Sequence, residues 1–199
     1  MYQEIVRNSE FYLDNNIFFP EATTFIITGK DIKYLISNLN SKPVTYFFKT
    51  FYAGGGLGEK GFRYKKAFLI NLPIPQIPES EQKPFEILVD YILLLKSKTK
   101  KINEFVDNEH IAQVFEEVID AMVMELYFEE EFHAKDLYFI RYVERDFKPI
   151  EHLESEEEKA KVINEAYQKL RQKDNEIRNN LKLMDLKLPD IVGPIKRVR

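Results

Sequence analysis

The sequence contains no cysteine, which excludes disulfide bonds and metal sites built from thiolates. Long apolar runs are missing too: no stretch reaches the roughly 18 residues that a membrane span needs. No signal peptide precedes the first strand-like segment. Together these absences predict a chain of the reducing cytoplasm, with no contact to a membrane.

Recognisable catalytic motifs are also missing. The three histidines, His110, His133 and His152, never stand four residues apart, and no HExxH pattern occurs. The Gly54–Gly58 run has spacing like that of a nucleotide loop but lacks the Lys-Ser/Thr and the strand–turn–helix context. Carboxylates are too plentiful for spacing to single out an acid or base. We therefore expect no catalytic residue, metal or cofactor in this chain, and a binding module rather than a free-standing enzyme.

Glycine is scarce, and most of it is concentrated in one place. Five of the seven glycines lie between residues 54 and 61, and a basic run follows at once. Glycine gives the backbone freedom and allows close approach, while Lys and Arg suit a polyanion and Tyr can lie against a base or sugar. The segment predicts a DNA-facing loop; the alternative is a solvated connection. Its candidate DNA-binding residues are Gly54, Gly55, Gly56, Lys60, Arg63, Tyr64, Lys65 and Lys66.

Charge is unevenly distributed along the chain. The formal net charge of −4 argues by itself against a nucleic-acid binder. However, residues 1–75 hold nine Lys or Arg against six Asp or Glu, whereas residues 76–199 hold twenty against twenty-seven. The first part therefore carries +3 and the second −7. Because the local field at a binding face matters more than the net charge, the first part is the better candidate for contact with DNA.

The first part predicts a small mixed domain of strands and helices. The segment 23–28 is rich in β-branched residues and is typical of a strand. The apolar triplets 11–13 and 17–19 flank an Asp-Asn-Asn turn signal and predict a hairpin. Residues 31–39 place their apolar side chains on one helical face, and Pro43 suits the first turn of a second helix, capped by Ser41 or the backbone of Lys42.

The second part predicts helices. A helix begins near Glu79, and residues 111–126 carry the most regular apolar stripe, so these two should pack as an antiparallel pair. Residues 154–183 predict one long charged helix with a thin apolar stripe, residues 129–131 a solvated turn, and residues 196–199 a disordered basic tail.

The proline-rich connector before Glu79 is the natural boundary between the two parts. The chain is thus predicted to have an α+β fold, with a small mixed strand/helix domain at residues 1–78 and a helical region at residues 79–199.

Three stretches resemble the C-terminal target recognition region of type IIG restriction–modification enzymes, the group with a TaqI-like specificity domain. They are Tyr2–Gly29, Lys33–Pro75 and Phe115–Phe128, in the same order along the chain. The most specific blocks are Asn38–Lys42 and Leu72–Pro75, and similar blocks occur in type I specificity subunits.

The resemblance implies sequence-specific recognition of duplex DNA, with Arg63 as the best candidate for a guanine contact. The parent would carry an endonuclease and an adenine-N6 methyltransferase, with S-adenosylmethionine and Mg²⁺ as cofactors, and the helical region would orient the module against them. This chain contains neither the Asn-Pro-Pro-Tyr motif of the methyltransferase nor a PD-(D/E)xK nuclease motif. We therefore expect a fragment of the parent that is not itself catalytic.

Two other functions stay open at this point. The acidic second part, which DNA should repel, suits a helical protein–protein docking module of a multi-subunit restriction–modification complex. In that case the 111–126 stripe and the long charged helix would contact the partner. Catalysis by the chain itself is the third possibility, and it would require activity with S-adenosylmethionine, or with Mg²⁺ and DNA.

Overall fold

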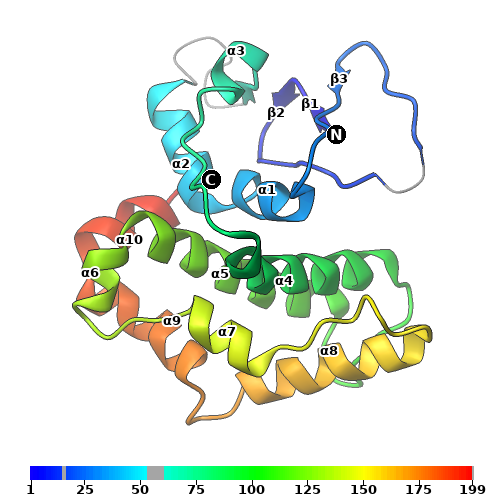
Figure 1. Cartoon of the computed structure of the whole chain (residues 1–199), viewed down its shortest axis with the longest axis vertical. Helices are drawn as coiled ribbons and strands as arrows, with labels where there is room; N and C mark the ends of the chain where they lie inside the picture. Colours follow the sequence, from blue (N-terminus) through cyan, green and yellow to red (C-terminus); the bar gives the residue numbers. More distant parts are fainter. Residues whose placement is uncertain (15–16, 53–60, 199) are drawn as a thin grey trace.

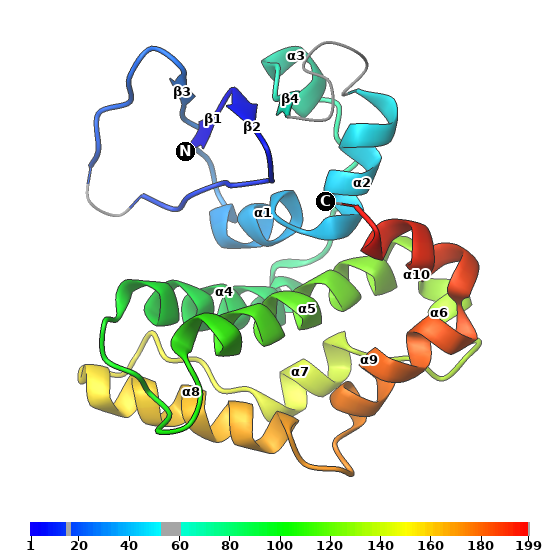
Figure 2. The same cartoon turned by 180° about the vertical axis from the view of Figure 1, so that it is seen from behind.

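The structure is a computed structural model, and it describes residues 1–14, 17–52 and 61–198. Short strands and three helices form one tier, and the longer helices form a second tier beneath it (Figures 1 and 2). The predicted α+β class is confirmed, with helices dominating. One cluster of buried side chains includes residues from both predicted domains, so the two tiers share a core.

Two small antiparallel ladders make up the described β structure. Strand β1 (Tyr2–Gln3) pairs with β3 (Thr24–Phe25), with Tyr2 opposite Phe25. Strand β2 (Ile5–Val6) pairs with β4 (Phe62–Arg63), with Ile5 opposite Arg63. Both ladders therefore join segments that are far apart in the sequence.

The predicted hairpin of residues 11–19 is wrong. Phe11 makes only an isolated bridge to Tyr2, and the described residues from 17 to 19 belong to no strand. Instead, the Asp14 carboxylate accepts a hydrogen bond from the backbone N–H of Phe18 at 2.8 Å. A local side-chain bond thus replaces the ladder that the apolar triplets would have formed.

The predicted helix pair after the strands is confirmed as α1 (Ile32–Leu39) and α2 (Lys42–Phe51). The Ser41 hydroxyl caps α2 by accepting from the Val44 N–H, and Pro43 occupies the first turn, where its missing N–H costs nothing. A short helix, α3 (Lys66–Leu69), follows β4. The segment after β4 is therefore helical.

Helices α4 (Glu79–Ser97) and α5 (Asn108–Tyr127) form the predicted pair and lie side by side in both views. Most of the α5 stripe is buried, with Ile111, Phe115, Val118 and Met122 fully so, and Val114 and Leu126 are partly buried. Helix α4 also packs against α1, and α5 against α2, so the upper tier rests on this pair.

The remaining helices surround the pair, and they correct three predictions. They are α6 (Glu129–His133), α7 (Ile140–Asp146), α8 (Glu156–Leu170), α9 (Glu176–Lys187) and α10 (Pro189–Lys196). The predicted long helix is two helices, because the Asn175 side chain accepts from the Arg178 N–H at 3.0 Å and starts α9. Residues 129–131 begin α6 rather than forming a turn. The basic C-terminus is ordered through Val198, and Lys196 bonds Asp185 at 2.6 Å.

Two tyrosines hold the proline-rich connector between the tiers. The Tyr34 hydroxyl of α1 donates to the carbonyl of Pro75 at 2.8 Å, and the Tyr127 hydroxyl of α5 donates to that of Pro73 at 2.9 Å. Burial raises the pKa of Tyr34 to about 12, so this donor keeps its proton at neutral pH. The connector carbonyls, which have no ladder of their own, are thus satisfied by side chains.

Asp120 of α5 anchors the start of α2. Its carboxylate accepts from the Lys42 backbone N–H at 2.7 Å, and the Lys42 Nζ lies 3.9 Å away. The side chain keeps only 13 % of its surface exposed. Burial raises its pKa from 3.8 to about 7, and the Lys42 contacts only partly offset that rise.

We expect the free energy of unfolding to fall as the pH rises from about 4 to about 7. Between these pH values Asp120 keeps its proton in the folded chain but loses it in the unfolded chain. The stabilisation that is fully present below the unfolded pKa is therefore lost as the pH rises to the folded pKa. The slope is on the order of 1 kcal/mol per pH unit. Asp120→Asn keeps the acceptor oxygen but cannot ionise, so urea unfolding at several pH values should show a flatter curve for this variant. Parallel curves for the two proteins would contradict this account.

Candidate nucleic-acid interface

Strand β4 separates apolar from basic side chains. Phe62 and Tyr64 are buried, whereas Arg63 and Lys65 between and after them are exposed. This is the alternation expected of a strand that covers a core on one face only. The predicted basic run is therefore held in place by β structure, with its cations pointing outward.

The inward side chains enter an aromatic cluster formed by Tyr2, Phe11, Phe48, Phe62 and Tyr64. The Tyr64 ring lies 4.4 Å from that of Phe48 and 5.0 Å from that of Phe62, centroid to centroid. Such ring pairs contribute about 0.5–1.5 kcal/mol each beyond the area that they bury. The aromatic cluster thus forms a rigid support beneath the exposed cations.

Tyr64 corrects the sequence prediction, which placed it against a base or sugar. Its side chain is 2 % exposed. Its hydroxyl forms a hydrogen bond with the Ser9 hydroxyl, which also forms one with the Thr45 hydroxyl. Burial raises the Tyr64 pKa to about 12. The residue is part of the core, and its ring presents no face to a ligand.

Arg63 lies on the outer face of the β2–β4 ladder. Its Nε is 3.5 Å from a carboxylate oxygen of Glu4, and its side chain is 46 % exposed. An ion pair this exposed contributes little to stability and can be exchanged for another anion at small cost. Arg63 is thus oriented by Glu4 and remains accessible to a partner.

Lys65 and Lys66 are brought to the same edge by the start of α3. Lys65 is the residue before the helix, and its Nζ lies 5.9 Å from the centroid of the Phe68 ring. Both lysines are exposed. Arg63, Lys65 and Lys66 are therefore all exposed where β4 leads into α3.

Sequence reasoning missed Arg7. The residue is exposed and directly follows β2, where Val6 pairs with Phe62. The β2–β4 ladder ends at this pair, so Arg7 comes one residue after the strand that pairs with Phe62 and Arg63. Only the long-range pairing reveals this, because Arg7 stands alone in the sequence. We call Arg7, Arg63, Lys65 and Lys66 the basic edge.

Four other predicted contact residues, Gly54, Gly55, Gly56 and Lys60, lie outside the described residues. The last glycine of the run, Gly61, is described and has a packing role. A Cβ built on it would stand 3.0 Å from the carbonyl oxygen of Val6. Glycine at this position therefore lets β4 approach β2 closely.

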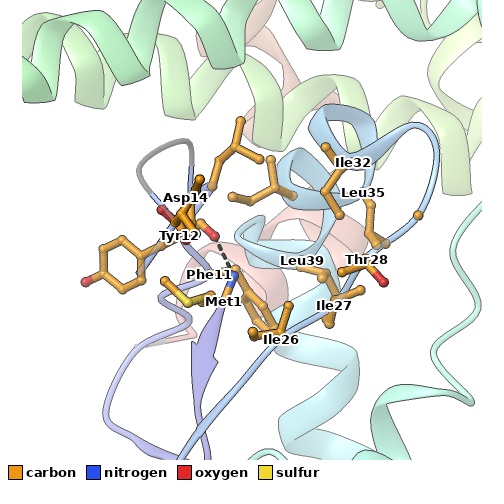
Figure 3. Close-up of a pocket in the computed structure, with 14 residues that line it drawn as sticks. Met1, Phe11, Tyr12, Asp14, Ile26, Ile27, Thr28, Ile32, Leu35 and Leu39 are labelled. Atoms are coloured by element: carbon orange, nitrogen blue, oxygen red, sulfur yellow. Dashed lines mark hydrogen bonds between the residues drawn. The ribbon is translucent and has the colours of Figure 1, made fainter. Parts of the chain in front are cut away.

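A hollow of about 480 Å³ opens on the other side of the upper tier. Figure 3 shows its wall, which is built mainly from apolar side chains of the N-terminal segment and of α1, including Phe11, Ile27 and Leu35. Ile17, which lines the hollow, is 83 % exposed, and Phe19, two residues later in the sequence, is 92 % exposed. This side of the tier therefore presents apolar surface rather than charge.

A buried carboxylate in the lower tier has a structural role. Glu125 accepts from the backbone N–H groups of Phe139 and Ile140 at 2.8 and 2.9 Å, next to the start of α7, and lies 3.0 Å from Nε2 of His133.

Across residues 1–14, 17–52 and 61–198, no group of three or more metal-binding side chains comes together. Within the same part of the chain, no helix is long and apolar enough to cross a membrane.

No family model, no curated protein and no solved structure matches this chain. Functional inference therefore starts from the geometry.

We expect Gly61→Ala to destabilise the protein by about 1–2 kcal/mol, because the added methyl group forces β4 away from β2. The matched control is Gly29→Ala, where a Cβ would meet no atom within 4 Å. Urea unfolding of the two variants measures the difference. Equal stability of Gly61→Ala and Gly29→Ala would show that the close approach at Gly61 is not required.

Proposed function

We propose that this chain is a sequence-specific recognition module for duplex DNA. The basic edge is the observation that supports the proposal. Its cations are exposed along the β2–β4 ladder and the start of α3, and the aromatic cluster packs beneath them. A row of cations on a firm backing suits the phosphates of a nucleic acid, which are regularly spaced. The resemblance to target recognition regions of type IIG restriction–modification enzymes points to the same partner.

Within the basic edge, we assign different roles to arginine and lysine. Arg63 has the planar guanidinium that can bond O6 and N7 of guanine together, and Glu4 fixes its direction. Lys65 and Lys66 are point charges on flexible stems and suit phosphate, as does the long side chain of Arg7. Because the strands and the aromatic cluster fix the backbone, little ordering is needed at the moment of binding.

The remaining parts of the proposal concern the parent protein. We place the S-adenosylmethionine-dependent methyltransferase and the Mg²⁺-dependent endonuclease in the part of the parent that this chain does not contain. The chain would select the DNA sequence for both activities, and its own residues would take no catalytic role. The proposed compartment is the cytoplasm, which suits a chain without cysteine.

A second candidate function is docking to a partner protein, and one observation favours it. Three consecutive large apolar residues, Ile17, Phe18 and Phe19, are exposed, and Ile17 lines the hollow. These exposed apolar residues lie in the upper tier, whereas the sequence analysis assigned such a contact to the acidic helices. Recognition of DNA and docking through this opposite side are compatible with each other.

The proposal predicts that Arg63→Ala, Lys65→Ala and Lys66→Ala, combined in one variant, weakens binding to duplex DNA. Each cation that meets a phosphate contributes about 0.9 to the slope of log K against log salt, so loss of the Lys65 and Lys66 contacts should flatten the slope by about 2. Fluorescence anisotropy of a labelled random-sequence duplex at several salt concentrations measures both effects. Thermal unfolding should change little, because all three side chains are exposed.

The matched control removes the same charge from the lower tier. Lys161, Lys173 and Lys182 are exposed on or beside α8 and α9, and their combined replacement by alanine should leave DNA binding nearly unchanged. If the two triple variants bind DNA equally well, the basic edge is not the contact surface and the docking function becomes the better account.

A further inference from the structure

Two large apolar side chains project at the loop end of the upper tier. Phe51, the last residue of α2, is 64 % exposed, and Ile70, which ends α3, is 71 % exposed. Figures 1 and 2 show the end of α2 and α3 beside each other at this tip. Both side chains therefore leave most of their apolar surface in contact with solvent.

The two side chains are mounted on a firm base. Directly beside Phe51, the Tyr52 ring stacks on the Phe68 ring at 5.3 Å with an angle of 5°, which joins the end of α2 to α3. The Tyr52 hydroxyl also approaches the Asn71 carbonyl at 3.4 Å. Phe51 itself rests against Phe47, with ring centroids 4.7 Å apart. The tip is therefore a rigid projection.

Positive charge adjoins the tip. The Ile70 N–H donates to the Lys66 carbonyl, so Ile70 stands one helical turn after a lysine of the basic edge. Lys65 directly precedes Lys66, and its Nζ lies 5.9 Å from the centroid of the Phe68 ring, which is one of the two stacked rings. An exposed apolar tip flanked by cations matches a partner that combines phosphate groups with stacked apolar bases.

We propose that Phe51 and Ile70 form an apolar wedge that enters between adjacent base pairs of the duplex held by the basic edge. Side chains of this kind part a base step and bend the duplex, which lets it meet more of the protein surface. This inference rests on the proposed function, since the cations must first bring the duplex to the tip. The wedge would add selectivity for flexible pyrimidine–purine steps, which part most easily.

An anionic membrane surface also combines charge with apolar depth, but the geometry favours DNA. A helix that lies in a membrane interface needs a long apolar face, whereas α3 spans only residues 66–69. Phe51 and Ile70 stand at the ends of α2 and α3, which the Tyr52–Phe68 ring stack joins, and this arrangement suits insertion at one step of a duplex.

The test is the double variant Phe51→Ala with Ile70→Ala. Its matched control is Phe105→Ala with Leu186→Ala, which removes exposed apolar side chains from the lower tier, where they are 88 % and 78 % exposed. A short random-sequence duplex with 2-aminopurine in place of adenine reports loss of stacking through its fluorescence, and anisotropy reports binding. At saturating concentrations, the wild type and the control variant should raise the 2-aminopurine fluorescence about two-fold. The wedge variant should still bind the duplex but should show only a small part of this increase.

The outcomes separate the wedge from DNA binding itself. Binding with an equal fluorescence rise in wild type and wedge variant would overturn the wedge, while the proposed function would stand. No binding of the wild type, seen by anisotropy, would overturn both. Binding to phosphatidylserine vesicles that the wedge variant loses, with no change on DNA, would overturn the wedge in favour of a membrane contact. Circular dichroism confirms that each variant is folded.

Discussion

The burial of α5 is the constraint on which the rest of the structure depends. Ile111, Phe115 and Met122 of its apolar stripe have no exposed surface, and α5 packs against α1, α2, α4, α6 and α9. Each such side chain contributes about 1.5–3 kcal/mol on burial. The stripe as a whole therefore favours folding by an amount comparable to the entire net stability of a domain. Both tiers are fixed by the same helix.

The proposed DNA contact is built outward from α5 in steps. Asp120 holds the start of α2, and α2 supplies Phe48, whose side chain is fully buried beneath Tyr64. Strand β4 lies on this support and turns Arg63 outward. The acidic lower tier is thus the foundation of the basic edge rather than its competitor. This arrangement explains how a chain with a net charge of −4 can present a local basic surface.

The helices that form the core were predictable because their signals are local. The apolar stripe of α5 repeats with the 3.6-residue period of a helix, and Ser41-Lys42-Pro43 marks the start of α2, so neither needs a partner to be recognised. The strands were not, since β1 and β2 pair with segments about 20 and 60 residues away and their register appears only in three dimensions. Tyr64 was assigned wrongly because the glycine-rich context outweighed the alternation of residues 62–65, which is typical of a half-buried strand. The break between α8 and α9 was missed because Asn175 was not weighed as a helix cap.

The most direct measurement of the central claim is selection from a randomised pool of duplex DNA at low salt, followed by sequencing of the bound fraction. Recognition by Arg63 on a fixed ladder predicts enrichment of one short motif that contains guanine. Retention of the pool without enrichment would mean that only phosphate is contacted, and the claim of sequence-specific recognition would fail. A chain that retains no DNA at all would contradict the account from its first step, the assignment of the basic edge.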